Sequence, residues 1–190
     1  MILPDDDPAL WRVAQSDYLV RNPWLTVRQD AVQLPNGGFI PDYFVFEYPN
    51  WVNIIAVTTN GQLILVRQYR HGIAGVHYEL CAGTVDPADG DSGAGLLLAA
   101  RRELLEETGY GGGNWQFFMS LSANTGTHTN MNHTFLATGV TWQQPQQLDL
   151  TEDITVHLVS PERALAIIDS GQMPQAMCAA PLLRYLLGRA

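Results

Sequence analysis

Short runs of hydrophobic residues, many of them β-branched or aromatic, are broken by turn residues in the first part of the chain, and this pattern is typical of β-strands. The first three runs cover residues 17–20, 25–32 and 43–46. Turn residues separate them, among them Pro35-Asn36-Gly37-Gly38, where Asn and Gly tolerate a positive φ angle. We expect three strands that form a small antiparallel sheet at the N-terminus.

Two β-branched runs follow, at residues 52–59 and 62–70, and they flank Asn60-Gly61. This dipeptide between two such runs is a strong signal for a β-hairpin. Later runs at 117–121, 131–136 and 154–159 also read as strands. The pattern therefore predicts a larger sheet that begins with a hairpin and continues after residue 110.

The apolar spacing changes to that of a helix over residues 95–108, and Gly109 is placed to end this helix. A Gly-rich polar segment precedes it, in which Asp91 or Ser92 is available as the N-cap. Two further helices are predicted, one from Pro161 after Ser160 and one over residues 174–187. Strands and helices in this succession predict an α/β fold.

Composition excludes several classes of protein. The chain has 190 residues, 46% of them hydrophobic and 15% charged, which fits a folded globular protein. Its net charge of −9 argues against nonspecific binding to nucleic acid or anionic membranes. There is no apolar run near the ~20 residues of a membrane span. Two distant cysteines, Cys81 and Cys178, and an acidic N-terminus predict a cytoplasmic protein.

Three acidic residues of the central helix carry the candidate chemistry. Glu103, Glu106 and Glu107 are spaced i, i+3 and i+4, so they share one face of the helix. Like charges at this spacing destabilise a helix unless something offsets them. Mg²⁺ binds carboxylate and phosphate oxygens, so a metal site is one explanation. A solvated acidic face in a structural protein is the alternative.

The run Arg102-Glu103-Leu104-Leu105-Glu106-Glu107-Thr108-Gly109-Tyr110, with Gly83 upstream, resembles the Nudix box of the Nudix hydrolases. The C-terminal half of that box matches at every position. In the N-terminal half, Asp89 stands where the family has Glu, and twelve residues rather than seven separate it from Arg102. We read the surplus as a longer loop before the helix.

The resemblance implies the fold, the cofactor and the metal ligands. The fold is the Nudix α/β/α sandwich with a mixed central sheet, here at residues 46–190, preceded by N-terminal strands at residues 1–45. Mg²⁺, or Mn²⁺ in its place, is bound by the carbonyl of Ala82 and by Glu103 and Glu107, with Glu106 assisting. Arg102 is expected to pair with a box glutamate and hold its rotamer.

Further residues are assigned a role by position. Arg70 falls where the family contacts substrate phosphate, Arg67 is a weaker candidate, and Glu79 lies near the substrate; surface ion pairs are the alternative for both arginines. Glu152, in the acidic segment before the strand at 154–159, is expected to be a third metal ligand or the general base. A solvated acidic turn is the alternative for Glu152.

The resemblance to the ADP-ribose pyrophosphatase branch implies the reaction: hydrolysis of a nucleoside diphosphate sugar to a nucleoside monophosphate and a sugar phosphate. The chain has Asn124-Thr125-Gly126 where that branch often has Ser-Pro-Gly, so GDP-mannose and NADH remain alternatives to ADP-ribose. The N-terminal strands imply a homodimer, or else a sheet that covers its own core. A nucleotide sensor with the same fold but impaired catalysis is the alternative to an enzyme.

Overall fold

The structure is a computed structural model that describes residues 8–22, 25–90 and 92–188. The chain forms two compact units. One unit runs up to Tyr48 and also includes Asn124–Asn130, and the other comprises Pro49–Ala123 and the chain from Met131 onward. Each unit is described by itself.

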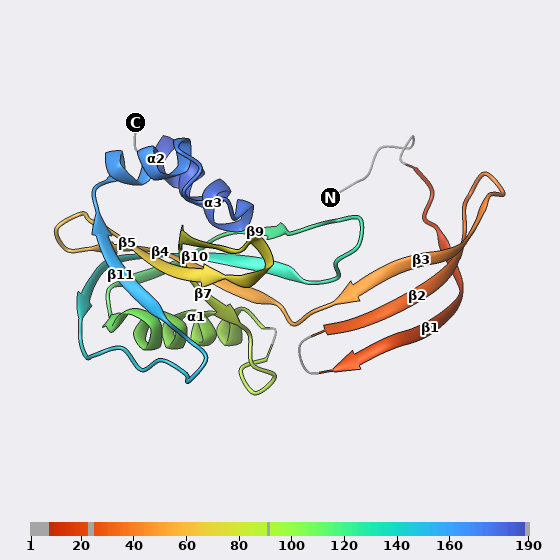
Figure 1. Ribbon diagram of the computed structural model, residues 1–190, viewed down its shortest axis with the longest axis horizontal. Helices are drawn as coiled ribbons and strands as arrows, with labels where there is room; N and C mark the ends of the chain where they lie inside the picture. The colour runs from red at the N-terminus through yellow and green to blue at the C-terminus, as the bar shows by residue number, and fades with distance from the viewer. Residues whose placement is uncertain (1–7, 23–24, 91, 189–190) are drawn as a thin grey trace. The chain divides into compact units, whose positions relative to one another are not determined.

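The first unit is a three-stranded antiparallel sheet in the order β1-β2-β3 (Figure 1). Its strands are β1 (Arg12–Asn22), β2 (Leu25–Gln33) and β3 (Phe39–Glu47). They are longer than the hydrophobic runs predict, because backbone pairing continues through polar positions such as Arg12↔Gln33. The segment Asn124–Asn130 belongs to this unit, and the N–H of Phe46 donates to the carbonyl of Thr127 at 2.7 Å.

The second unit is built on an eight-stranded mixed sheet with the main order β11-β5-β4-β10-β8. Strands β6, β7 and β9 pair with β5, β4 and β10 respectively. The strands are β4 (Trp51–Thr58), β5 (Leu63–Arg70), β6 (Gly75–Glu79), β7 (Cys81–Thr84), β8 (Tyr110–Gly111), β9 (Asn114–Ser122), β10 (Met131–Trp142) and β11 (Ile154–Val159). Strands β4 and β10 are parallel, and the other pairings between the described strands of this sheet are antiparallel.

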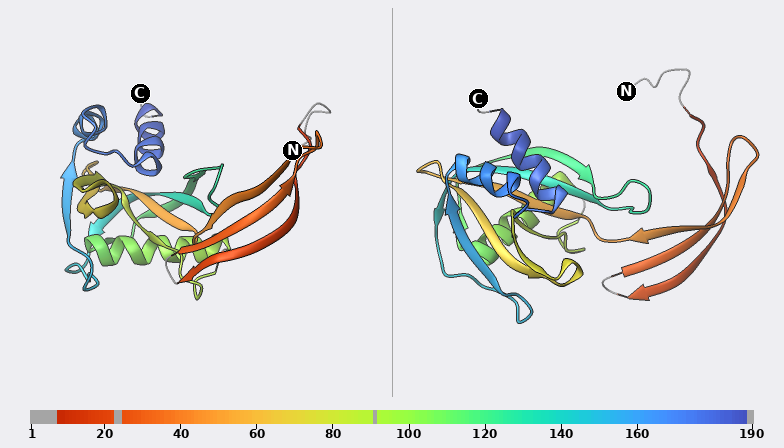
Figure 2. Two further views of the ribbon diagram at one scale, coloured as in Figure 1. Left: turned by 45° about the vertical axis from the view of Figure 1, so that its right-hand side comes forward. Right: turned by 45° about the horizontal axis from the view of Figure 1, so that its top comes forward.

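Helices cover both faces of this sheet (Figures 1 and 2). They are α1 (Gly93–Thr108), α2 (Pro161–Asp169) and α3 (Ala176–Leu187), and a 3₁₀ turn covers His71–Ile73. Ile54 and Val66 pack in a buried cluster with side chains of α1, whereas Ile55 and Leu65 pack with side chains of α2 and α3. Successive residues of each strand therefore pack into two different hydrophobic cores, one on each face of the sheet. This confirms the predicted α/β/α sandwich.

The predicted hairpin and central helix are confirmed as well. Strands β4 and β5 are antiparallel, with Ala56 opposite Ile64, and Gly61 has a φ of 78° in the turn between them. The strand predicted at residues 131–136 extends to Trp142, because β10 pairs with β4, β9 and β8 in turn. Within the described part of the chain, no helix is both long and apolar enough to cross a membrane.

Candidate active site

Helix α1 carries the box acids, and its two ends are well defined. The side chain of Ser92 accepts a hydrogen bond from the N–H of Gly95, so Ser92 is the N-cap, while Asp91 lies outside the described residues. The helix ends at Gly109, which has a φ of 75° and donates its N–H to the carbonyl of Leu105. A left-handed residue at this place favours glycine, which explains the stop.

The three glutamates of α1 are not equally placed. Glu103 and Glu107 are buried, with 9% and 4% of their surface exposed, because positions i and i+4 both face β7. The side chain of Glu106 is 38% exposed and lies further around the helix. The structure therefore brings Glu103 and Glu107 together with β7 and leaves Glu106 at the edge of this cluster.

Strand β7 and helix α1 meet through two close contacts. A Cβ atom added to Gly83 would lie 2.0 Å from Cδ of Glu103 and 2.2 and 2.4 Å from its two carboxylate oxygens. The backbone N–H of Ala82 donates to Oε2 of Glu107 at 3.1 Å. The absence of a side chain at Gly83 thus allows the present close approach of the Glu103 carboxylate to β7.

Arg102 connects the acids at the edge of the cluster. Its Nη1 lies 2.9 Å from Oε1 of Glu103 and 3.0 Å from Oε2 of Glu106, and its Nη2 lies 3.5 Å from Oδ2 of Asp89. The guanidinium can make these contacts together because its donors form a planar fork. Asp89, which replaces the first glutamate of the box, therefore helps to hold Arg102 despite the longer loop that follows it.

Burial raises the pKa of both glutamates that face β7. The pKa of Glu107 rises from its ordinary value of 4.5 to about 7, chiefly through loss of solvent. Hydrogen bonds from the Cys81 thiol and the Ala82 N–H oppose this rise, and the charges of Glu103 and Glu152 add to it. The pKa of Glu103 is also raised, again chiefly by burial.

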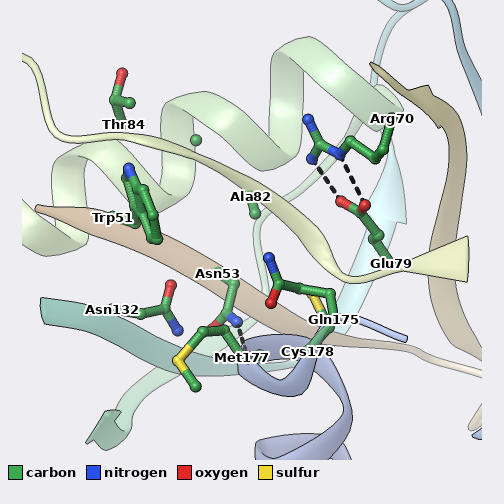
Figure 3. A pocket seen from close by; sticks show the side chains of 11 residues that line it. Trp51, Asn53, Arg70, Glu79, Ala82, Thr84, Asn132, Gln175, Met177 and Cys178 are labelled. Carbon is green, nitrogen blue, oxygen red and sulfur yellow. Dashed lines mark hydrogen bonds and ion pairs between the residues drawn. The ribbon is translucent and has the colours of Figure 1, made fainter. Parts of the chain in front are cut away.

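Arg70 and Glu79 form a bidentate ion pair (Figure 3). Nε of Arg70 lies 2.7 Å from Oε1 of Glu79, and Nη2 lies 2.5 Å from Oε2. Glu79 is 3% exposed, whereas 45% of the Arg70 side chain is exposed. The guanidinium of Arg67, the weaker candidate, instead lies over the ring of Tyr78, 4.8 Å from its centroid, and Arg67 does not line the pocket described below.

Glu152 lies in the exposed turn before β11. Its Oε2 accepts the N–H of Asp149 at 3.0 Å, so the side chain bends back on its own turn. Its charge nevertheless raises the pKa of Glu103 and of Glu107, which puts it within electrostatic reach of both. The role of Glu152 as a metal ligand or general base therefore remains a prediction.

A pocket of about 390 Å³ lies beside these groups and is lined in part by Arg70, Glu79, Ala82 and Gly83 (Figure 3). Sequence reasoning assigned no role to six of its lining residues: Asn53, Thr84, Asn132, Gln175, Met177 and Cys178. A signal was present for Asn53, because a polar residue in the apolar run 52–57 must face something polar. The remote residues of α3 had no such signal, since their contact with β4 is tertiary.

The acidic side chains beside β7 are the candidate donors for a metal ion. No group of three or more His, Cys, Asp or Glu side chains could hold an ion by itself within residues 8–22, 25–90 and 92–188. Two buried carboxylates do converge on β7, at the place where Gly83 leaves room for one of them. These residues fit a hard divalent ion that takes its remaining oxygens from backbone, substrate phosphate and water, which is the usual situation for Mg²⁺.

A mixed sheet between helices, with a glycine-containing strand packed against a Glu-rich helix, is the arrangement that the resemblance to the Nudix box implies. The sequence model of the NUDIX domain matches residues 48–177, which is more than half of the chain. The model of the "Nucleoside diphosphate sugar hydrolase N-terminal domain" matches residues 11–46. The chain therefore belongs to the Nudix hydrolase family, as the box residues predict.

Individual relatives support the same branch. An "ADP-ribose pyrophosphatase" of Mycobacterium tuberculosis (strain ATCC 25618 / H37Rv) is 36% identical over 114 residues, which cover 60% of this chain and 53% of the relative. The matched region thus spans about half the length of that protein. An "ADP-ribose pyrophosphatase" of Bacillus subtilis (strain 168) is 30% identical over 151 residues, or 79% of this chain and 78% of the relative. The predicted resemblance to this branch is confirmed.

The crystal structure of a protein described as "ADP compounds hydrolase" has the same fold. It superposes with a TM-score of 0.80 and covers 98% of this chain and 99% of that chain. Its sequence is 20% identical, so this likeness supports the fold alone.

Proposed function

We propose that this chain hydrolyses the diphosphate linkage of a nucleoside diphosphate sugar such as ADP-ribose, giving a nucleoside monophosphate and a sugar phosphate. The observation that carries the proposal is the convergence of the buried Glu103 and Glu107 carboxylates on Ala82 and Gly83, two residues that also line a pocket. The names of the relatives and of the N-terminal family model support the choice of substrate class.

We propose Mg²⁺ as the cofactor, with Mn²⁺ as a substitute. The carbonyl of Ala82 and the carboxylates of Glu103 and Glu107 would hold it, with Glu106 and Glu152 as further oxygen donors. When bound, a divalent ion neutralises phosphate charge and lowers the pKa of a coordinated water. This accounts for two buried carboxylates on one helix face, which are costly to ionise without a cation.

The other residues would position the substrate and the acids. Arg102 contacts Glu103 and Glu106 and thereby holds their carboxylates in place. Arg70 is half exposed at the pocket, where its guanidinium can donate to a phosphate oxygen while Glu79 keeps it oriented. Glu152 is our candidate for the general base, because it is exposed to solvent and close enough to influence the two buried acids.

Substrate turnover tests the proposal directly. ADP-ribose, GDP-mannose and NADH are incubated with the purified chain in Mg²⁺, in Mn²⁺ and in excess chelator, and release of nucleoside monophosphate is followed. We expect metal-dependent release of AMP and ribose phosphate from ADP-ribose that Glu103→Gln abolishes. Tight binding of these compounds without turnover in any metal would instead indicate a nucleotide sensor.

We also propose two domains and a homodimer. Residues 1–45 would form the N-terminal sheet and residues 46–190 the catalytic domain, which is supported by family models that match 11–46 and 48–177. Every residue of β1 is exposed in the single chain, including Val13, Leu19 and Val20. An apolar strand surface of this kind is typical of an interface, so a second copy of the chain is our candidate partner.

We place the protein in the cytoplasm. Both cysteines, Cys81 and Cys178, are buried and free, which suits a reducing compartment.

A further inference from the structure

The face of the central sheet that packs against α3 carries polar side chains where two strands run in parallel. Strands β4 and β10 are in register with Trp51 opposite Asn132 and Asn53 opposite Thr134. Residues two apart on a strand share a face, and so do residues paired across neighbouring strands. Asn53, Asn132 and Thr134 therefore lie on the same face as Ile55, which packs with α2 and α3.

These polar side chains are buried and incompletely paired. Asn53 is 1% exposed and Asn132 is 3% exposed. Oδ1 of Asn53 and Nδ2 of Asn132 have no hydrogen-bond partner among the described residues. Buried amide groups are normally satisfied, and an unsatisfied one destabilises the free protein, so these two need an explanation.

Both asparagines line the pocket that also contains Ala82 and Gly83 (Figure 3). Nδ2 of Asn53 donates to the carbonyl of Met177 at 2.6 Å, which fixes Oδ1 as the free acceptor of that amide. The carboxamide of Asn132 has no partner to fix it, and the terminal torsion of Asn is soft. Both unpaired atoms are buried behind the pocket wall, so a turn of Asn132 about its soft terminal torsion brings its donor to a ligand there, and a small movement of Asn53 exposes its acceptor.

Apart from Arg70 and Glu79, the residues that line the pocket are uncharged, which favours a neutral part of the substrate beside them. The charge of Arg70 is offset by Glu79, with which it forms two hydrogen bonds. Helix α3 begins at the pocket, and Gln175 at its N-cap lines the pocket and makes no side-chain cap bond, so its amide adds a neutral donor and acceptor. Hydroxyl groups both donate and accept, and several of them on one ring match such a set of neutral partners.

We propose that this pocket binds the sugar of the substrate on the far side of the diphosphate, and that Asn53 and Asn132 determine specificity by hydrogen bonding to its hydroxyl groups. This inference rests on the proposed function and adds to it the residues that recognise the sugar, Asn53 and Asn132. It also explains the unpaired amides, because they are retained for the ligand at a cost in stability.

The test uses Asn132→Leu, which keeps the volume and removes the amide, and Asn132→Ser as a smaller, neutral second variant. Thr134→Val is the matched control, because Oγ1 of Thr134 is also buried and unpaired on the same face but Thr134 does not line the pocket. For each protein, kcat/KM is measured for ADP-ribose, for IDP-ribose, which differs only in the base, and for the β-methyl ester of ADP, which lacks the sugar. The melting temperature of the ligand-free protein is measured in parallel.

We expect both Asn132 variants to lose about tenfold in kcat/KM for ADP-ribose and IDP-ribose and to change little for the methyl ester, since one hydrogen bond to the sugar is lost. Asn132→Leu should also melt at a higher temperature than the wild type. Thr134→Val should retain wild-type kinetics. An equal loss on all three substrates, a change in the preference between the two bases, or no change at all would overturn the proposal.

Failure of the proposed function is recognised separately. If the wild-type chain hydrolyses none of the three compounds, that function fails, and the same comparison is made by calorimetric binding. Weaker binding of ADP-ribose but not of the methyl ester by the Asn132 variants would still support the sugar pocket. Equal binding of both compounds by all variants, or no binding by the wild type, would overturn it.

Discussion

Gly83 and Glu103 lie so close together that a side chain at position 83 would displace the carboxylate of Glu103. The Cβ of any larger residue at position 83 would stand 2.0 Å from Cδ of Glu103. The φ angle of Gly83 is not in the left-handed region, so the constraint is the neighbouring carboxylate and not the backbone conformation. The glycine of the box is therefore explained by the position of an acid twenty residues further along the chain.

The first prediction concerns this contact. Gly83→Ala should displace the Glu103 carboxylate and lower metal-dependent kcat/KM by about 10² or more, because small displacements of catalytic groups have effects of that size. Gly93→Ala, in α1 itself, is the control: the added Cβ meets nothing within 4 Å, and alanine favours helix. The two variants are compared by steady-state kinetics and thermal unfolding; equal activity in both would contradict the role of the contact.

The second prediction concerns the stability of the metal-free protein. The folded state raises the pKa of Glu107 from 4.5 to about 7, so it holds the proton more tightly than the unfolded chain. This contribution is complete below pH 4.5 and is lost as the pH rises to about 7, a difference of roughly 3 kcal/mol in the free energy of unfolding. Urea denaturation at pH 5 and pH 8 should show the decrease in the wild type and a smaller one in Glu107→Gln.

The third prediction is that divalent metal reverses this trend. An ion must displace the proton of Glu107 before it binds, so metal affinity should increase as the pH rises through about 7. The increase in melting temperature produced by a fixed Mg²⁺ concentration should be larger at pH 8 than at pH 6. A shift of the same size at both pH values, or the same pH dependence in Glu107→Gln, would show that Glu107 is not the group involved.

The fourth prediction separates the charge of Arg102 from its shape. Arg102→Lys keeps the positive charge but cannot contact Glu103, Glu106 and Asp89 at once, so kcat/KM should decrease about 10- to 100-fold. Arg101→Lys is the control, because Arg101 lies over the ring of Trp115 and is exposed. Wild-type kinetics in Arg102→Lys would mean that charge alone suffices.

The fifth prediction concerns Glu152. If it is the general base, Glu152→Gln should lower kcat by ~10²–10⁴-fold with little change in thermal stability, because the side chain is exposed. Removing its charge should also lower the pKa of Glu107, which the charge of Glu152 now raises. Asp149→Asn, in the same turn, is the control. Unchanged turnover would leave Glu152 as a residue of a solvated turn.

The proposed homodimer can be tested without an activity measurement. Leu19→Glu places a charge on the exposed apolar surface of β1 and should convert a dimer into a monomer in light-scattering measurements. Gln15→Glu adds the same charge at a polar position of the same strand and should leave the dimer intact. A wild-type protein that is already monomeric would exclude this interface.

Local patterns were sufficient for much of the fold and for half of the site. The Asn60-Gly61 hairpin, the helix that ends at Gly109 and the pairing of Arg102 with a box glutamate depend on residues near in sequence, and the structure contains them. The lengths of β1 and β10 could not be predicted from local patterns. Pairing with neighbouring strands extends both through residues whose own preference for β-structure is weak.

By itself, the sequence determined the family, most of the strands, the three helices, and the acids on one face of α1, since each follows from spacing within a single element or from matched box positions. Only the tertiary structure decided which acids are buried, why Gly83 is a glycine, that Arg70 is paired with Glu79, and that Asn53 and Asn132 line a pocket with the start of α3. The reason is physical: burial, close approach and hydrogen bonding between distant segments depend on how β4, β7, β10, α1 and α3 pack, and no local pattern encodes that packing.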